Sequence, residues 1–331
     1  MPETAGPSPH GRADAYVAEE QDWRLFRGDG VQREVEIPAG PPWRHFAGPS
    51  DETARQQPYL IAAAAVDSVN AALYLRRPLL VTGRPGVGKS SLADAIAHEL
   101  ALGPVLRWPV NSRSALQDAL YRYDAIGRLQ DSNLSRNEGR APARIGTFIR
   151  LGPLGNALAL SAAGRPRVLL VDELDKGDVD LPNDLLNVFE EGWFEIPELS
   201  RLPADQASVE VLTADADAPF TVPRGIVRCR HFPLVVITSN GERDFPPAFL
   251  RRCLPLHLDD PGEQQLREII AGHLGPQADT EELLTEFLSR RGVGDLATDQ
   301  FLNAVFLRSG GAKLSPDGLL NTVLHHLNSG R

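Results

Sequence analysis

The stretch GRPGVGKS, residues 83–90, constrains the fold of this chain more than any other feature. It fits the pattern G-x-x-x-x-G-K-[ST] in full. The apolar run RRPLLVTG before it is typical of a short buried strand, and SSLADAIAHELAL after it has apolar residues at helical spacing. At ordinary residue usage a chance match would occur in roughly one chain in a hundred of this length. The sequence therefore predicts a phosphate-binding loop between a strand and a helix.

Each residue type in this loop has a chemical task. The glycines let successive backbone N–H groups converge on a phosphate, aided by the positive end of the following helix. Lys89 carries the neutralising charge, Ser90 has the hydroxyl expected on Mg²⁺, and Ser91 is assigned to the α-phosphate side. The predicted nucleotide-binding residues of the loop are Gly83, Arg84, Pro85, Gly86, Val87, Gly88, Lys89, Ser90 and Ser91.

A second strand, in VLLVDELDKGD, ends in the carboxylates Asp172 and Glu173. Because parallel strands deliver their carboxyl ends to one edge of the sheet, this pair should lie beside the phosphate loop. Asp172 would bind nucleotide-associated Mg²⁺ through a water or together with Ser90, so the predicted metal residues are Ser90 and Asp172. Glu173 would polarise the attacking water as general base. We expect Asp175 and Lys176 to be surface or interface charges.

A third strand, PLVVITSN, ends in Asn240, whose amide could orient water against the γ-phosphate. Strands that alternate with helices predict a parallel sheet covered by helices. After LPLHLDDPGE four further segments have helical spacing with no strand between them, which predicts a second, all-helical domain. The predicted fold class is α/β, a P-loop NTPase with a nucleotide-binding core over residues 59–258 and a small helical domain over 259–331.

Residues 1–58 are rich in Pro, Gly and charge, and we expect an extended, partly disordered arm with its first twenty residues disordered. Trp23, Phe26, Trp43 and Phe46 are isolated apolar residues that could dock this arm as a strap on the body. Simple packing is favoured over a specific partner site at these aromatics.

The net charge and the spacing of the cysteines limit the expected partners and cellular compartment of the protein. The formal net charge of -10 has the wrong sign for a surface that neutralises many phosphates, so nucleic acid is not an expected partner. The two cysteines lack CxxC spacing, which fits a reducing compartment. No charged head with an apolar run opens the chain, and no stretch approaches 18 apolar residues. We expect a cytoplasmic protein without a membrane partner.

With these motifs in this order, the chain resembles the AAA+ ATPases, whose Walker A, Walker B and sensor 1 residues would be the loop, the acidic pair and Asn240. The stretches LYRYDAIGRL, GPLG, LLNVFEEGWFEIPEL and FLRRCL resemble the MoxR-like branch, and the resemblance covers roughly residues 59–310. It implies a five-stranded parallel sheet, a helical lid, a homo-oligomeric ring usually of six subunits, and ATP-driven remodelling of a protein partner. MoxR-like proteins typically act with partners that carry a von Willebrand factor A domain.

The resemblance also implies an arginine finger in FLRRC, residues 249–253. In the MoxR pattern the finger follows an acidic residue, which aligns Arg252 with the finger and Arg251 with the acidic position. Arg252 is therefore the expected principal finger, supplied to the nucleotide of a neighbouring subunit, and Arg251 a second contact to phosphate or to the interface.

Two further elements of the family are the hairpin before sensor 1 and the sensor 2 residue of the lid. The segment ASVEVLTADADAPFTVPRGIVRCRHF resembles the hairpin that precedes sensor 1. The lid helix that often carries a sensor 2 arginine has Thr298, Asp299 and Gln300 at that place. The arginines that could substitute are Arg267, Arg290, Arg291 and Arg308.

Two alternatives stay open at this stage: a P-loop phosphotransferase acting on a small molecule, and a nucleic-acid translocase. A phosphotransferase usually needs a substrate-binding insertion and a lid with several arginines, and ATP hydrolysis without an acceptor would separate the two classes. The negative net charge and the lack of a basic-aromatic tract speak against a translocase. The guanine-specific NKxD pattern is absent from the sequence, which favours ATP over GTP.

Overall fold

The protein is described by a computed structural model over residues 23–44, 61, 63–215, 219–275, 280–291, 296–315 and 318–325. The first twenty residues, the predicted anchor Phe46 and the predicted start of the core at residue 59 lie outside the described residues. Within the described residues no helix is long and apolar enough to cross a membrane.

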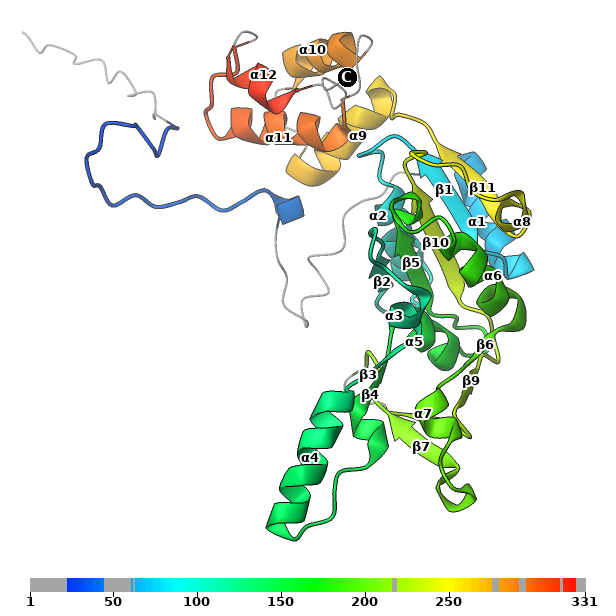
Figure 1. Cartoon of the computed structure of the whole chain (residues 1–331). Helices are drawn as coiled ribbons and strands as arrows, with labels where there is room; N and C mark the ends of the chain where they lie inside the picture. The colour runs from blue at the N-terminus through cyan, green and yellow to red at the C-terminus, as the bar shows by residue number, and fades with distance from the viewer. Residues whose placement is uncertain are drawn as a thin grey trace, which may run out of the picture.

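A five-stranded sheet in the order β11-β1-β10-β5-β2 forms the centre of the molecule, and every strand pairs in parallel with its neighbours (Figure 1). Its strands are β1 (Leu79–Gly83), β2 (Leu106–Pro109), β5 (Val168–Asp172), β10 (Leu234–Ser239) and β11 (Leu254–Leu258). The predicted parallel sheet is confirmed. Since all strands run the same way, β1, β5 and β10 end at one edge, where the predicted site residues follow them.

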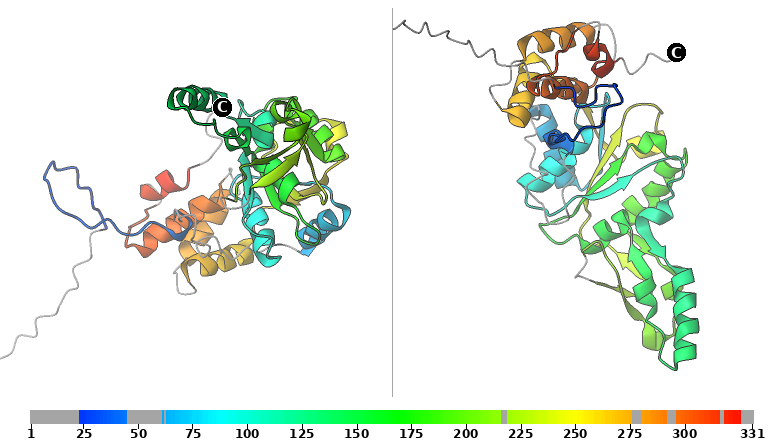
Figure 2. Two further views of the ribbon diagram at one scale, coloured as in Figure 1. Left: turned by 90° about the horizontal axis from the view of Figure 1, so that it is seen from below. Right: turned by 90° about the vertical axis from the view of Figure 1, so that its left-hand side faces the viewer.

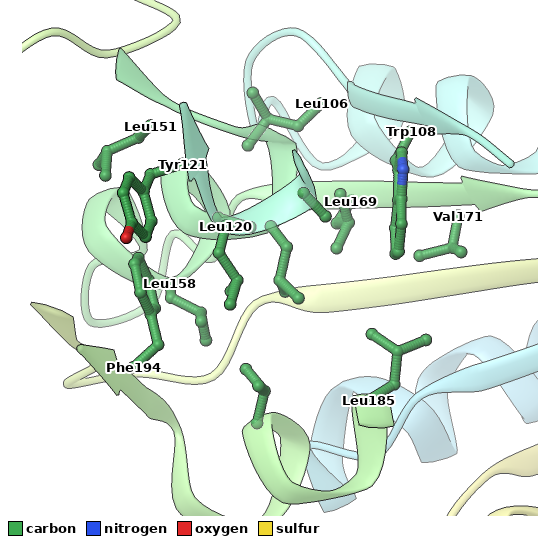
Figure 3. Packing of buried hydrophobic residues seen from close by; sticks show 14 of the residues in the cluster. Leu106, Trp108, Leu120, Tyr121, Leu151, Leu158, Leu169, Val171, Leu185 and Phe194 are labelled. Atoms are coloured by element: carbon green, nitrogen blue, oxygen red, sulfur yellow. The ribbon is translucent and has the colours of Figure 1, made fainter. Parts of the chain in front are cut away.

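Alternate residues of the central strands enter two separate cores, one on each face of the sheet. Leu169 and Val171 of β5 pack into one cluster, while Val168 and Leu170 pack into the other. Helices α5 (Pro153–Leu160) and α6 (Leu181–Glu191) cover the first face, and α1 (Ala63–Leu75) and α2 (Lys89–Glu99) contribute buried residues to the second. Figure 3 shows Leu169 and Val171 in the first cluster together with Leu185 of α6. This two-sided burial explains why the strands are almost uniformly apolar.

A β-α-β insertion separates β2 from α5. It contains α3 (Leu116–Leu120), β3 (Tyr121–Tyr123), α4 (Ala125–Glu138) and β4 (Ile149–Leu151), with β3 and β4 antiparallel. Asp124 caps α4 by accepting a hydrogen bond from the Gly127 N–H at 2.8 Å. Helix α4 extends from the core at the end opposite the C-terminal helices (Figures 1 and 2).

The predicted hairpin before β10 is present as β7 (Ser208–Val211) and β8 (Phe220–Pro223), which pair antiparallel. The next strand, β9 (Ile226–Arg228), pairs instead with β6 (Trp193–Glu195), which follows α6. Short helices α7 (Pro197–Ser200) and α8 (Pro247–Leu250) lie in the connections.

Among the described residues four helices follow the sheet, one in each of the predicted helical segments. They are α9 (Glu263–Leu274), α10 (Glu281–Arg291), α11 (Thr298–Ser309) and α12 (Leu319–Val323). They share a hydrophobic cluster of their own, in which the Phe287 and Phe301 rings stack with centroids 4.7 Å apart. The position of the domain boundary at residues 258 and 259 remains a prediction, and the last strand ends at Leu258.

Trp43, at the short 3-10 helix η1 (Pro42–Arg44), joins the N-terminal arm to these helices. Its indole Nε1 donates to Asn303 Oδ1 at 3.1 Å, and its ring meets the His273 and Phe306 rings edge-on at 5.7 and 5.9 Å. Phe26, by contrast, is 87% exposed. The predicted docking of the arm is therefore confirmed for Trp43, which contacts the helical domain, and is wrong for Phe26.

Candidate nucleotide-binding site

The phosphate loop joins β1 to α2 as predicted. Gly86 has φ 79° and Gly88, the N-cap of α2, has φ 90°, conformations that side chains disfavour. The Lys89 ammonium folds back onto the loop and donates to the carbonyls of Gly83 and Arg84, each at 2.8 Å. Burial lowers the pKa of Lys89, and the negative charges of nearby carboxylates, Asp175 first among them, partly offset this effect.

Ser90, in the first turn of α2, and Asp172, the last residue of β5, come together. The Ser90 hydroxyl donates to Asp172 Oδ1 at 2.6 Å, which joins the phosphate loop to the end of β5. A hydroxyl and a carboxylate are oxygen donors of the kind Mg²⁺ takes, with phosphate oxygens and waters for the remaining positions. Across the described residues no group of three or more His, Cys, Asp or Glu could hold a metal ion, so a fully protein-made cage is not formed there. The residues present fit a metal that is bound mainly through a nucleotide.

Thr238 of β10 links this pair to Glu173. Its hydroxyl donates to Asp172 Oδ1 at 2.7 Å and accepts the Glu173 N–H at 2.8 Å, while its side chain is almost fully buried. Glu173 adopts φ 58° and ψ 51°, the left-handed region that a residue with a side chain rarely enters. Such strain persists where surrounding contacts hold it and is common at functional sites.

The carboxylate of Glu173 has two neighbours. Lys176 Nζ donates to Glu173 Oε1 at 2.7 Å, and this contact raises the pKa of Lys176. Asn240 Nδ2 donates to the same oxygen at 3.4 Å, a long hydrogen bond. The predicted base and the predicted water-orienting amide are therefore adjacent at the sheet edge.

The prediction that Asp175 is a surface or interface charge is wrong. Only 3% of Asp175 is exposed, and it lies in the short 3-10 helix η4 (Leu174–Lys176), directly after the acidic pair. The prediction failed because a DELDK run looks solvated in isolation, whereas this fold turns the second aspartate beneath the end of β10. Lys176 is more exposed, but it contacts Glu173 rather than standing apart from the site.

The helical domain also reaches the phosphate loop. A Cβ on Gly86 would stand 2.7 Å from Ala297 Cβ and 3.2 Å from Asp299 Oδ1, so the start of α11 packs on the loop. Arg84 forms an ion pair with Asp260, in the segment between β11 and α9, at 3.0 Å. The segment in which a sensor 2 residue was sought thus lies at the loop, with Asp299 rather than an arginine beside Gly86.

The four arginines considered as substitutes have partners among the C-terminal helices and the segment before them. Arg267 pairs with Glu263 and Glu281, Arg290 with Glu286, and Arg308 with Glu282. Arg291 donates to the Pro261 carbonyl at 2.9 Å and lies over the Phe287 ring.

Arg251 and Arg252 lie at the end of the sheet where the parallel strands begin, whereas the phosphate loop lies at the end where they finish. Leu254 pairs with Leu79 at the start of β1, whereas Leu258 pairs with Gly83 at its end. The intervening strand spans about 13 Å at roughly 3.3 Å per residue. Arg252 forms an ion pair with Glu190 and donates to the Ala248 carbonyl, and Arg251 Nε donates to the Pro247 carbonyl. The two guanidinium groups therefore have different partners, and neither joins the phosphate loop of its own chain.

Sequence reasoning missed two residues that shape the site, Thr238 and Asp175. Thr238 did leave a signal, because a threonine in the apolar run LVVITS faces the same direction as the buried neighbours two positions away. No comparable signal exists for Asp175, since its two hydrogen-bond donors lie 65 and 67 residues further along the chain.

A parallel sheet with a phosphate loop after β1, an acidic pair at the end of β5 and a polar residue after β10, which lies between them, defines a P-loop nucleotide-binding protein. The profile of the AAA domain family, dynein-related subfamily, matches residues 78–253, more than half of the 331-residue chain. The chain therefore belongs to this family and so to the AAA+ ATPases.

Among individual proteins, the chain is similar to the chaperone protein ClpB of Chlamydia caviae, with 28% identity over 222 residues, 62% of this chain and 23% of that protein. Chaperone protein ClpB of Chlamydia trachomatis is 28% identical over 208 residues, 59% of this chain and 22% of that protein. The chain thus spans less than a quarter of the length of these curated relatives. A crystal structure of a candidate ATPase from Cytophaga hutchinsonii matches 62% of this chain and 53% of its own, with 14% identity and a TM-score of 0.33.

Proposed function

We propose that this chain is an ATP-hydrolysing subunit of a MoxR-like AAA+ ring that remodels or switches a protein partner. The observation that carries the catalytic part is the Ser90–Asp172 hydrogen bond at 2.6 Å. It brings together the two expected magnesium residues, Ser90 in the first turn of α2 and Asp172 at the end of β5, with Glu173 and Asn240 at the same sheet edge.

Each side chain of the site would have its own role in ATP hydrolysis. Lys89, released from the loop carbonyls, would neutralise the β- and γ-phosphates, while Ser90 and Asp172 would hold Mg²⁺. When bound with ATP, the ion would neutralise charge that develops on the phosphoryl oxygens. Glu173 would accept the proton of the attacking water, for which it must exchange its contact with Lys176. The Asn240 amide would orient that water.

In the proposed ring, Arg252 supplies the finger to the neighbouring subunit's nucleotide. Its place at the far edge of the sheet supports this role, because the guanidinium is remote from its own phosphate loop. Its partner Glu190 is 53% exposed, and an ion pair in that setting is weak enough to be exchanged for a phosphate. Arg251 would contribute a second contact at the interface.

The remodelling part rests on the family and on the MoxR-like stretches of the sequence. The similarity to proteins named as chaperones favours a protein over a nucleic acid as the partner. The MoxR-like stretches favour a partner with a von Willebrand factor A domain. Stimulation of ATP hydrolysis by single-stranded DNA that persists at raised salt would contradict this choice and favour a translocase.

Two substitutions test the catalytic part. Lys89→Ala should abolish ATP binding, because the phosphates lose their main neutralising cation. Glu173→Gln should keep ATP affinity in calorimetry but lose turnover, because the binding groups remain and only the base is gone. ATP affinity equal to wild type in Lys89→Ala would refute the role of the loop. The Glu173→Gln protein, held with ATP, is then the bait for isolating the partner.

A further inference from the structure

The buried carboxylate of Asp175 connects the end of β5 to the end of β10. Its Oδ2 accepts the backbone N–H of Asn240 at 2.9 Å and that of Glu242 at 3.1 Å. Gly241, between these two residues, has φ 78°, so the chain turns sharply there and both N–H groups reach one oxygen. A carboxylate that accepts two backbone N–H groups forms charge-assisted bonds, which are short and directional.

This contact determines where the Asn240 side chain lies. Asn240 is the first residue after β10, and its backbone N–H is held by Asp175. The Asn240 amide in turn donates to Glu173 Oε1 at 3.4 Å. A shift of the turn would therefore change the distance between the amide and the Glu173 carboxylate without altering the phosphate loop.

The second oxygen of Asp175 has a different environment. Within the described residues, Asp175 Oδ1 is buried and accepts no hydrogen bond. The neutral isostere asparagine could therefore keep the accepting oxygen toward the turn and place its NH₂ group at the Oδ1 position. A glutamate would keep the charge but lengthen the side chain by one methylene in a closely packed place.

We propose that Asp175 is a positioning residue for ATP hydrolysis, which fixes the Asn240–Glu242 turn through Oδ2 and so aims the Asn240 amide at the water activated by Glu173. This inference rests on the proposed function, because it assigns Asp175 to the same hydrolytic step. Asp175 contacts neither nucleotide nor water in this role and acts through Asn240.

Two substitutions distinguish the position of the Asp175 side-chain oxygen from its negative charge: Asp175→Asn keeps the position and removes the charge, and Asp175→Glu keeps the charge and shifts the position. If position matters, Asp175→Glu should lower kcat at least tenfold and Asp175→Asn by less than about threefold, with ATP affinity within about threefold of wild type in both. If the negative charge matters instead, the order reverses, and that result would overturn the proposal. Asp178→Glu is the matched control, because Asp178 lies on the same loop but its Oδ1 accepts the exposed Asp180 N–H at 3.0 Å, within its own turn.

Two further measurements complete the test. Hydrogen exchange of the nucleotide-free protein should be faster at the Asn240 and Glu242 amides in Asp175→Glu than in wild type, and unchanged exchange would contradict the contact itself. Because Asp175 acts through Asn240, Asp175→Glu should lower kcat no further in an Asn240→Ala background, whereas multiplied losses would refute the pathway. Absence of ATPase activity in wild type would refute the proposed function, while wild-type activity retained in Asp175→Glu would refute this inference alone.

Discussion

Thr238→Val removes one hydroxyl from the centre of the site and leaves the side-chain shape nearly unchanged. In wild type that hydroxyl donates to Asp172 Oδ1 at 2.7 Å and accepts the Glu173 N–H at 2.8 Å. The substitution therefore deletes a bond to a carboxylate and leaves a part-buried N–H without its partner, for a combined loss of about 2–3 kcal/mol of unfolding free energy. For a domain of this size that loss lowers Tm by roughly 4–12 °C.

Thermal unfolding of the nucleotide-free protein measures this loss, and Thr238→Ser is the matched control. Serine keeps the hydroxyl and loses a buried methyl, which costs about 1 kcal/mol. Turnover should also fall in Thr238→Val, because the strained Glu173 backbone at φ 58° loses the bond that holds it. An unchanged Tm in Thr238→Val, or a larger drop in Thr238→Ser, would refute the bridging role of the hydroxyl.

Two further predictions concern the ring and the N-terminal arm. Arg252→Ala subunits mixed with Lys89→Ala subunits should regain ATPase activity that neither has alone, because one kind keeps the loop and the other the finger; no recovery in proven mixed rings would defeat the finger in trans. Burial lowers the pKa of His273 against the Trp43 edge, so the folded state resists protonation there. The stability of the helical domain should therefore be full above about pH 6.5 and fall as the pH drops through the lowered pKa, measured by tryptophan fluorescence of pH-dependent unfolding. Trp43→Ala, which opens the His273 ring to solvent, should weaken that pH dependence, and an identical profile would contradict the contact.

The sequence by itself determined the local parts of this protein. The phosphate loop, the strand that ends in Asp172 and Glu173, and the strand before Asn240 were predicted and are present. The four C-terminal helical segments were also predicted, and the described residues hold a helix in each, although α12 is shorter than its predicted segment. These features depend on residues near one another in the chain, where glycine content and apolar spacing directly limit the backbone. The convergence of the three strand ends also followed, because parallel strands must share one carboxyl edge.

The tertiary structure decided which polar groups meet at that edge. Thr238 reaches Asp172 across 66 residues, and Asn240 donates its N–H to Asp175 across 65. The docking of α11 on Gly86 and of Trp43 on the helical domain are contacts between equally remote segments. No local pattern encodes such pairs, because a buried polar group is satisfied by whichever donor the packed chain brings within about 3 Å of it. For that reason the sequence identified Asp175 only as a charged residue. Its hydrogen bonds to the Asn240 turn depend on the pairing of β5 with β10, which brings the two strand ends together.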